Sequence, residues 1–434
     1  MADLNVTDPI FAFAATQPAV PAIIEGERSM GYAALCRGVR AAAAAFRDAG
    51  WRPGEIIGVS HTGARALHLV VALGLARGGF AQIALPPEDS PVQLRARVAR
   101  AGVRAVVADH EGAAALGVPV LAPAAAWLDG ADATDAAVAG ADHVWLIAET
   151  SGTTGTPKLI GLTHAMEDAH HRRNAPLLSL HSGERFLNLT GLHFTMGLKR
   201  ALWVLRDGAT HVFTPRGMTF EQLPAFIDAR EVSYLNCVPL HLHHLLGAVG
   251  GAAPRFPRLR VLRSSSAPLP APVLAEVRRR ISPNVFVNYG VSETGAIFAA
   301  TPAMLEAHPD TVGHPLGDVE VEIVDAADRP LPPGAGGLVR LRGSGICPAY
   351  LRGGAADAAQ VFRQGWCYPG DAGVLDTDGL LYLKGRADEV MNFDGLMVGP
   401  AEIEAVMLAY PGVTGACAFP LPAAGHLEVP AAAY

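Results

Sequence analysis

The first 110 residues alternate between apolar runs of strand length and longer segments with helical periodicity, and this order restricts the fold more than any other feature. The expected strands are 55–60, 80–85 and 104–108, and the expected helices are 32–49, 64–77 and 91–102. Strands that alternate with helices of this length indicate right-handed βαβ crossovers and a largely parallel sheet. We therefore expect an α/β protein.

A second alternating stretch follows, and the pattern then changes. Its expected strands are 186–189, 211–214, 234–238, 260–263 and 285–288. From residue 318 the apolar period becomes two, in V-E-V-E-I-V and again in G-L-V-R-L-R at 337–342. Period-two runs between Gly/Pro turns are typical of antiparallel β structure. We predict two α/β subdomains within residues 1–317 and a small β-barrel-like subdomain at 318–386.

Length and composition narrow the class of protein. The chain has 434 residues, which exceeds one ordinary core, and its net charge of −7 gives no strong attraction to nucleic acid or anionic membranes. The apolar run 66–75 is short and lies between Arg65 and Arg77, so it reads as a buried helix. No secretory signal pattern opens the sequence, and five dispersed cysteines favour reduced thiols. We expect a cytoplasmic protein with no nucleic-acid partner and no membrane span.

The segment E-T-S-G-T-T-G-T-P-K at 149–158 has the chemistry of a phosphate-binding loop. An apolar run at 144–148 leads into it as an expected strand. Glycines let backbone N–H groups approach an anion, threonine hydroxyls add donors, and Lys158 adds a positive charge. The familiar Gly-Lys-Ser/Thr ending is absent, which disfavours a kinase-type phosphate loop. An ordinary surface turn is the alternative.

This ordered string resembles the signature loop of the adenylate-forming superfamily, which includes acyl-CoA synthetases, adenylation domains of peptide synthetases and luciferases. Later segments resemble further motifs of that superfamily in the same order. They are N-Y-G-V-S-E-T at 288–294, Y-P-G-D-A-G at 368–373 and G-R-A-D-E-V at 385–390, with a weaker N-terminal match at 30–35. The resemblance covers almost the whole chain. It implies an α/β core at 1–386 and, at 387–434, a hinge and the start of a small α+β C-terminal domain.

The resemblance implies that ATP activates a carboxylic acid to an acyl-adenylate, with release of pyrophosphate. The residues implied to contact the phosphates of ATP are Ser151, Gly152, Thr153, Thr154, Gly155 and Lys158. Glu293 would hold Mg²⁺, a hard cation that favours carboxylate oxygen. Lys158, Glu293 and Arg386 are the implied catalytic residues.

The nucleoside contacts are carried over in the same way. Tyr289 would stack on adenine, and Asp371 would accept hydrogen bonds from the ribose hydroxyls. Arg386 would share the ribose and α-phosphate region as a permanent cation. The other implied ATP-binding residues are Ser266, Ala267, Pro268, Asn288, Gly290 and Ser292, and Asp388 is the implied hinge.

The acid itself is less constrained. The acyl-pocket residues implied by the resemblance are His193, Phe194, Thr195, Gly197 and Val238. Thr195 stands where peptide synthetases usually carry an aspartate for the substrate amino group, which disfavours an α-amino acid. Lys199 and Arg200 could meet a second carboxylate, but exposed charges on an amphipathic helix are the favoured interpretation.

Other polar clusters have plainer interpretations. His241, His243 and His244 lie too far from cysteine or acidic partners in sequence to favour a metal site. Residues 170–173, H-H-R-R, are expected to form a solvated helix face.

The sequence ends at Tyr434, before the lysine motif with which family members usually close. The resulting expectation is a chain that binds ATP and acid but adenylates slowly. For the second half-reaction coenzyme A is the leading acceptor, and the phosphopantetheine arm of an acyl carrier protein is the alternative. A non-catalytic module that only binds nucleotide or acid is the alternative from another class.

Overall fold

The computed structural model describes residues 4–130, 133–135, 137–138, 140–150, 157–178, 180–251, 253–352, 355–389, 391–393, 396–408, 410, 413, 416–422 and 428–433. The chain divides into two compact units. Unit 1 comprises Met1–Gly250, Phe256–Leu262 and Ala349–Gly353. Unit 2 comprises Gly251–Arg255, Arg263–Pro348 and Gly354–Tyr434. The subdomain boundaries expected at 317 and 386 stay predictions.

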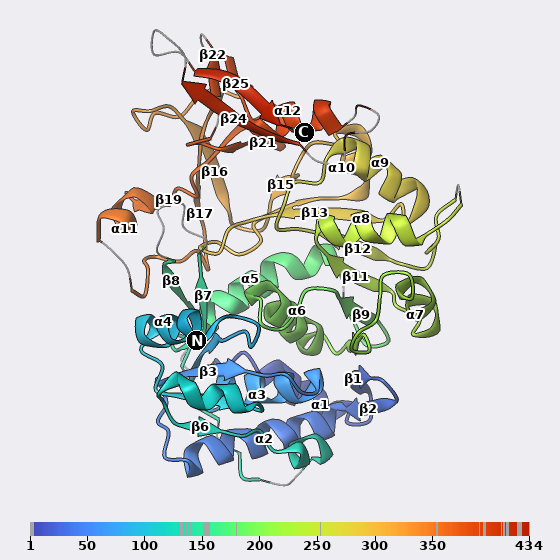
Figure 1. Ribbon diagram of the computed structural model, residues 1–434, viewed down its shortest axis with the longest axis vertical. Helices are drawn as coiled ribbons and strands as arrows, with labels where there is room; N and C mark the ends of the chain where they lie inside the picture. Colours follow the sequence, from blue (N-terminus) through green and yellow to red (C-terminus); the bar gives the residue numbers. More distant parts are fainter. Residues whose placement is uncertain are drawn as a thin grey trace. The chain divides into compact units, whose positions relative to one another are not determined.

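One sheet of unit 1 contains the β strands of the first alternating stretch (Figure 1). Its strand order is β6-β5-β3-β4-β7-β8. The strands are β3 (Ile56–Ser60), β4 (Ala81–Ala84), β5 (Ala105–Ala108), β6 (Val120–Leu121), β7 (Val144–Glu149) and β8 (Leu159–Thr163). Neighbours pair in parallel except β7 and β8, which are antiparallel. The predicted parallel α/β arrangement is confirmed here.

A second group of paired strands in unit 1 has the order β11-β9-β10-β1-β2. These strands are β1 (Pro21–Glu25), β2 (Arg28–Gly31), β9 (Arg185–Asn188), β10 (Thr210–Phe213) and β11 (Tyr234–Cys237). All pairs are parallel except β1 with β2. The carboxyl ends of β9, β10 and β11 therefore meet at one edge, where ligands of α/β proteins commonly bind.

Small residues allow helices of unit 1 to pack closely against one another. They are α1 (Asp8–Thr16), α2 (Tyr32–Asp48), α3 (Arg65–Arg77), α4 (Pro91–Ala101), α5 (His164–Leu178), α6 (Thr195–Arg206), α7 (Leu223–Ala229) and α8 (Pro239–Ala248), with short 3-10 helices η1 (Glu111–Leu116) and η2 (Ala125–Asp129). A Cβ on Gly74 would lie 2.7 Å from the Ala42 Cβ, so glycine is what lets α3 approach α2. Every residue of α3 from Leu69 to Arg77 is buried.

The segment after β5 contributes side chains to the core of unit 1. Trp127, within η2, is 6% exposed and packs edge-on against Phe46 with ring centroids 5.8 Å apart. Leu116, at the end of η1, is also buried. Large apolar side chains in these short helices thus belong to the core, because each removes apolar area from water.

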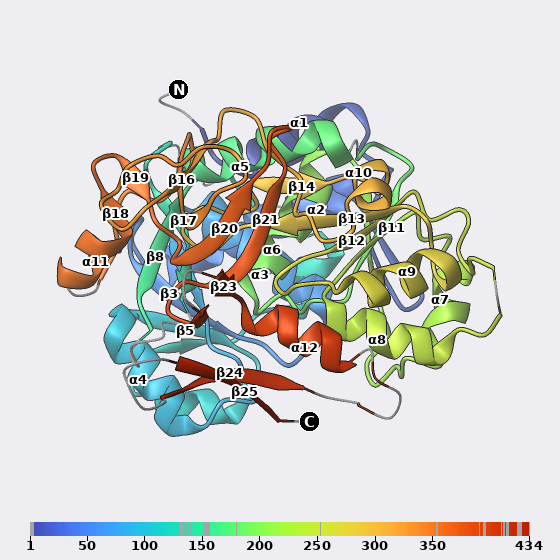
Figure 2. The same cartoon turned by 90° about the horizontal axis from the view of Figure 1, so that it is seen from above.

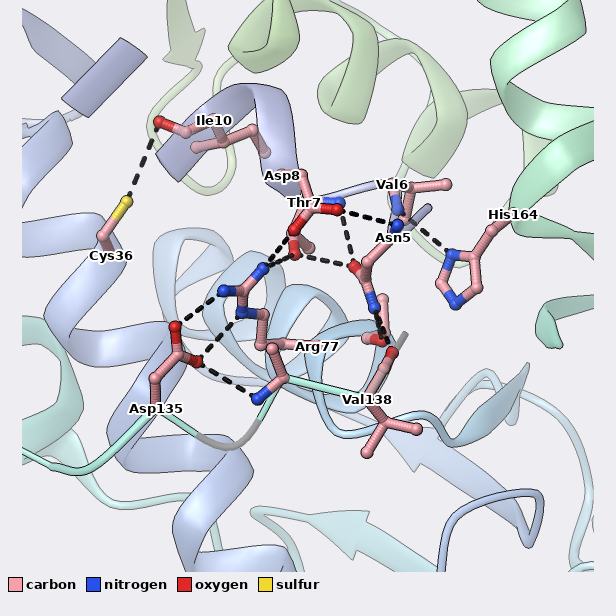
Figure 3. A network of polar contacts seen from close by, with 12 residues as sticks. Asn5, Val6, Thr7, Asp8, Ile10, Cys36, Arg77, Asp135, Val138 and His164 are labelled. Carbon is pink, nitrogen blue, oxygen red and sulfur yellow. Dashed lines mark hydrogen bonds and ion pairs between the residues drawn. The ribbon is translucent and has the colours of Figure 1, made fainter. Parts of the chain in front are cut away.

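The N-terminal segment is fastened to unit 1 by a network around Arg77 (Figure 3). The Arg77 guanidinium donates to Asp8 at 2.6 Å and to Asp135 at 2.7 Å. The Asn5 side chain donates to the carbonyl of Ala76 at 2.8 Å, and the Val6 N–H donates to His164 Nδ1 at 3.2 Å. The two bonds from Arg77 are charge-assisted, which is the stronger class, and they join residues remote in sequence.

Unit 2 is mainly antiparallel β structure, as the period-two runs predicted (Figure 2). Its largest group of paired strands has the order β18-β19-β17-β20-β21, with β16 also paired to β17. These are β16 (Glu320–Val324), β17 (Gly336–Arg342), β18 (Phe362–Arg363), β19 (Trp366–Cys367), β20 (Asp371–Leu375) and β21 (Leu381–Arg386). Its buried core includes Ile323, Val339 and Leu381, which pack against Phe298.

The remaining elements of unit 2 are shorter. The strands are β13 (Val285–Tyr289), β14 (Phe298–Ala300), β15 (His314–Pro315), β22 (Met391–Phe393), β23 (Leu396–Val398), β24 (Cys417–Pro422) and β25 (Glu428–Ala433). The helices are α9 (Ala271–Arg280), α10 (Pro302–Ala307), α11 (Ala355–Val361) and α12 (Pro400–Leu408). Strand β12 (Val261–Ser264) has residues in both units.

Candidate nucleotide and acid sites

A carboxylate and a guanidinium face each other at one end of the β20–β21 hairpin. Asp371 opens β20, Arg386 closes β21, and the two are register partners. Arg386 Nη1 donates to Asp371 Oδ1 at 3.0 Å and to the carbonyl of Pro369 at 2.6 Å. A Cβ on Gly370 would lie 2.5 Å from Arg386 Nη2, so glycine makes room for the guanidinium. Asp371 is 8% exposed, which makes this a partly desolvated ion pair.

Tyr289 binds the other oxygen of the same carboxylate. Its hydroxyl donates to Asp371 Oδ2 at 2.5 Å, across 82 residues of sequence. Burial, and then the negative charge of Asp371, raise the pKa of the Tyr289 hydroxyl well above its ordinary value. The phenol therefore stays protonated and remains a donor. The structure thus brings Tyr289, Asp371 and Arg386 together, three residues predicted from separate motifs.

The turn after β13 presents a glutamate from a tightly packed loop. A Cβ on Gly290 would overlap the Gly295 carbonyl, so this position requires glycine. The Val291 N–H donates to Thr294 Oγ1 at 3.1 Å, and the Cys347 N–H donates to the Glu293 carbonyl at 2.7 Å. Glu293 is 9% exposed, so it is not an ordinary solvated surface glutamate.

Other predicted nucleotide-site residues of unit 2 lie at exposed or backbone-bonded positions. Asn288 donates to the carbonyl of Phe298 at 2.9 Å, and Ser292 is exposed. The segment Ser266, Ala267 and Pro268 is an exposed loop directly after β12. Ser266 has φ +74°, a left-handed conformation that is uncommon for residues with a side chain and often marks functional loops. Asp388 Oδ1 lies 3.9 Å from Arg386 Nε.

Lys158 belongs to unit 1. Its ammonium lies 5.2 Å from the centroid of the Tyr350 ring, a cation–π distance. Its backbone N–H donates to Thr150 Oγ1 at 3.3 Å, and the Thr150 N–H donates to the Lys158 carbonyl at 3.0 Å, so the two ends of the loop are clasped together. The predicted loop residues Ser151, Gly152, Thr153, Thr154 and Gly155 lie outside the described residues.

The predicted acyl-pocket residues surround very little free space. His193, Phe194 and Thr195 line a cavity of about 20 Å³, which has room for about one water. A Cβ on Gly197 would overlap the carbonyl of Gly191, and Val238 donates its N–H to a neighbouring histidine. The roles of these five residues in acid binding stay predictions.

A larger cavity, of about 240 Å³, lies in unit 1 at the carboxyl ends of β9 and β10. We call it the Arg65 cavity. Its lining residues are Arg65, 188–192, 213–214, 218–220, Leu223 and His241. Sequence reasoning missed it, although its place at the carboxyl edge of parallel strands is the expected one for a ligand. The position of this cavity could be inferred only once the order of the strands was known.

Several of the charges expected to be solvated on α5 and α6 are buried, whereas Arg172 is exposed as expected. Lys199 is 8% exposed, and its ammonium lies 2.7 Å from His170 Nδ1 and 3.3 Å from Glu167 Oε2. Burial lowers the pKa of Lys199. Arg200 and Arg173 are buried as well, and Arg200 lies over the Trp203 ring at 4.0 Å. The interpretation of these residues as solvated charges was wrong, because α5 and α6 turn them toward each other.

Two negative findings apply to the part of the chain that the structure describes. Within it no helix is long and apolar enough to cross a membrane. Within it no three side chains of His, Cys, Asp or Glu converge as metal ligands, at the histidines of α8 or elsewhere.

Comparison with known proteins decides the family. The model of the AMP-binding enzyme family matches residues 10–351. The chain belongs to this family. The resemblance of the motifs to those of the adenylate-forming superfamily is thereby confirmed. The sulfoacetate–CoA ligase of Cupriavidus necator is 30% identical over 352 residues, which cover 76% of this chain and 68% of the ligase.

Other members of the family are longer. AMB antimetabolite synthetase AmbB of Pseudomonas aeruginosa is 29% identical over 416 residues, which cover 92% of this chain and 32% of that protein. A probable CoA ligase of Humulus lupulus is matched over 54% of its length. The chain therefore spans about a third to about half of these relatives.

A solved structure confirms the fold of this AMP-binding enzyme. The o-succinylbenzoate CoA synthetase of Bacillus subtilis, in complex with its acyl-adenylate intermediate, superposes with a TM-score of 0.88 at 22% identity. The match covers 100% of this chain and 88% of that structure. The predicted mixed α/β architecture is confirmed over the whole length.

Proposed function

We propose that this chain uses ATP to activate a carboxylic acid and then passes the acyl group to a thiol, coenzyme A being the leading acceptor. A carboxylate oxygen of the acid attacks the α-phosphorus, the bond from that phosphorus to the bridging oxygen breaks, and pyrophosphate leaves. The thiol sulfur then attacks the acyl carbon and AMP leaves. Family membership supports this chemistry, since relatives include ligases that join acids to coenzyme A.

The observation that carries the proposal is the arrangement of Tyr289, Asp371 and Arg386. An ionised carboxylate fixed by a phenol and a guanidinium is an acceptor suited to two adjacent ribose hydroxyls. The guanidinium is a permanent cation beside it, suited to an α-phosphate. Tyr289 adds an aromatic face at the end of β13 for adenine.

The phosphate end would be served by Lys158 and Glu293. Lys158 would neutralise charge that develops on the leaving pyrophosphate, which is the main way proteins catalyse such transfers. Glu293 fits a Mg²⁺ site, since Mg²⁺ is typically held by one or two carboxylates together with substrate phosphates. The metal would neutralise phosphate charge.

Two further expectations stay predictions. Transfer to a carrier-protein phosphopantetheine is favoured by one observation, that relatives include a fatty acid–acyl-carrier-protein ligase and a probable nonribosomal peptide synthetase. A cytoplasmic location is supported by five free cysteines. The slow adenylation expected from the sequence is measured by the experiment that follows.

Acid-dependent exchange of labelled pyrophosphate into ATP tests the proposal, with aryl, fatty and dicarboxylic acids as substrates. We expect exchange with at least one class and a loss of about 100-fold or more in Lys158→Ala and Glu293→Gln. Glu306→Gln, at an exposed ion pair with Arg278, is the matched control and should exchange normally. Calorimetry with ATP runs in parallel.

ATP binding without exchange for any acid would make the chain a nucleotide-binding module. Absence of ATP binding would contradict the proposed site altogether. If exchange occurs, coenzyme A and a phosphopantetheinylated carrier are then supplied separately, and the thioester product identifies the acceptor.

A further inference from the structure

The Arg65 cavity contains a cation without an acidic partner. Arg65 Nη1 donates to the carbonyl of Thr214 at 2.5 Å and to its hydroxyl at 2.9 Å, and both acceptors are neutral. Among the residues that the structure describes, no acidic side chain lines the cavity. The Glu25 carboxylate is near, but it accepts the backbone N–H groups of Arg65 at 2.9 Å and Ala66 at 3.0 Å. Glu25 thus caps the first turn of α3 and leaves the guanidinium without an ion pair among the described residues.

Arg65 is partly buried, which disfavours its charged form. Burial lowers the pKa of Arg65, with Glu25 partly opposing the effect and Arg216 adding to it. Arg216 is a second, exposed cation close enough to act on Arg65, and its guanidinium donates to the carbonyl of Gly63. A partly desolvated cation is stabilised by an anion that also accepts its hydrogen bonds. The local charge therefore favours an anionic ligand.

Two further donors line the same cavity. His241 Nδ1 accepts the N–H of Val238 at 3.4 Å, so the neutral ring carries its proton on Nε2. Burial, and then the neighbouring His244, lower the pKa of His241, so the ring is neutral at pH 7. The Thr190 hydroxyl oxygen is buried and has no hydrogen-bond partner in the described part of the chain. The polar side of the cavity thus offers hydrogen-bond donors around one positive charge.

The rest of the lining limits the size of the ligand. Leu192, Phe213 and Leu223 give the cavity an apolar side. Its volume of about 240 Å³ lies below the roughly 300–1,000 Å³ typical of drug-sized ligands, which favours a short ligand over a long acyl chain. A short hydrocarbon stem that ends in an anionic group matches both sides.

We propose that the acid activated by this chain is short and carries a second anionic group, a carboxylate or sulfonate, which binds Arg65 and the Nε2–H of His241. This inference rests on the proposed function and names its substrate class. It places the second anionic group of the acid at Arg65 and not at Lys199, whose ammonium is already paired with Glu167.

Calorimetry of acid binding tests the inference with pairs matched in carbon number, succinate against butyrate and glutarate against valerate, and with sulfoacetate against propionate. In each pair the first acid has two anionic groups (a two-headed acid) and the second has one (a one-headed acid). We expect at least one two-headed acid to bind about 10- to 100-fold more tightly than its one-headed partner, as for a charge-assisted hydrogen bond. Arg65→Gln should reduce that ratio to within a few-fold. Arg47→Gln, exposed at the end of α2, is the matched control and should keep the ratio.

If the melting temperature shows that Arg65→Gln does not fold, His241→Phe tests the same binding site independently. It removes the donor without touching the Thr214 contacts of Arg65, so the two-headed acid should bind several-fold more weakly and the one-headed acid equally well. Equal binding of matched acids by the unaltered chain would overturn the inference. So would an unchanged ratio in a folded Arg65→Gln.

Failure of this inference is separable from failure of the proposed function. A chain that prefers two-headed acids in calorimetry but forms no adenylate contradicts the proposed function only. A chain that exchanges pyrophosphate equally well with matched one-headed and two-headed acids contradicts this inference only.

Discussion

Asp371 is an anionic acceptor whose two oxygens already have donors within unit 2, from Tyr289 and from Arg386. These contacts fix the carboxylate plane before any ligand arrives, and preorganisation of this kind reduces the ordering cost of binding. The motif around Asp371 is local, and it was readable in the sequence. The bond to Tyr289 joins two strands 82 residues apart, so only the folded chain shows it.

Asp371→Asn should weaken the binding of AMP by about 10- to 100-fold. The amide keeps the shape of the side chain but loses the charge, and hydrogen bonds to a charged group contribute about 1.5–3 kcal/mol. Calorimetric titration with AMP measures the change. Asp378→Asn, at an exposed position of the same hairpin, is the control and should bind AMP normally. Equal affinities for both variants would remove Asp371 from the nucleotide site.

Helix α6 begins in close contact with the loop that follows β9. The carbonyl of Gly191 occupies the place of a Cβ on Gly197, and Asn188 donates to the Gly197 carbonyl at 3.2 Å. The contact positions the amino end of α6 beside the Arg65 cavity, since residues 188–192 belong to its lining. Gly197 therefore has a packing role, whatever its place in acid binding.

Gly197→Ala should lower the free energy of unfolding by about 1–3 kcal/mol, because the added methyl group overlaps a backbone oxygen. Gly247→Ala is the matched control, since it also lies in a helix and an added Cβ would meet nothing within 4 Å. That control should be neutral or stabilising by up to about 1 kcal/mol. Urea titration of both variants gives the comparison, and equal stabilities would show that α6 can shift.

At the level of elements, the strand and helix positions of unit 1 were predictable because period and length identify them. Helix α2, expected at 32–49, spans Tyr32–Asp48, and α4, expected at 91–102, spans Pro91–Ala101. Burial of Lys199 was not predictable. A lysine on a helix is normally solvated, and only the packing of α6 beside Glu167 and His170 of α5 changes that.

The candidate acid site could not be predicted from the sequence for the same reason, because it depends on how elements pack together. The sequence motif located residues 193–197, but a cavity depends on which strand ends meet, and β9, β10 and α8 meet only in the fold. Arg65 carried no motif at all. Its side chain points to a ligand only in the fold, where no carboxylate of the described residues forms an ion pair with its guanidinium.

Buried histidines make the stability of the whole molecule depend on pH. Burial is the largest cause that lowers the pKa of His164 to about 4 and of His211 to about 3, against an ordinary value of 6.5. Between these values the unfolded chain binds more protons than the folded chain. The free energy of unfolding therefore rises with pH through this window and falls as the solution is acidified.

His211→Phe should flatten this pH dependence, because the ring lies between Phe186 and Phe213 and titrates only on unfolding. The effect removed is on the order of a few kcal/mol between pH 7 and pH 4. Urea unfolding at several pH values measures it. His243→Asn, at an exposed position on α8, is the control and should leave the slope unchanged. Identical slopes for both variants would contradict the burial argument.

The network around Arg77 also has a consequence for synthesis of the chain. Asn5 bonds to the carbonyls of residues 71 and 133 positions later, and Val6 bonds to a side chain 158 positions later. At about 5–20 residues per second, a ribosome needs roughly 8–30 s to make that intervening stretch. During this time the first helix has no finished place to dock. The opening segment of the chain is thus among the earliest to be made and can reach its final position only after His164 has emerged.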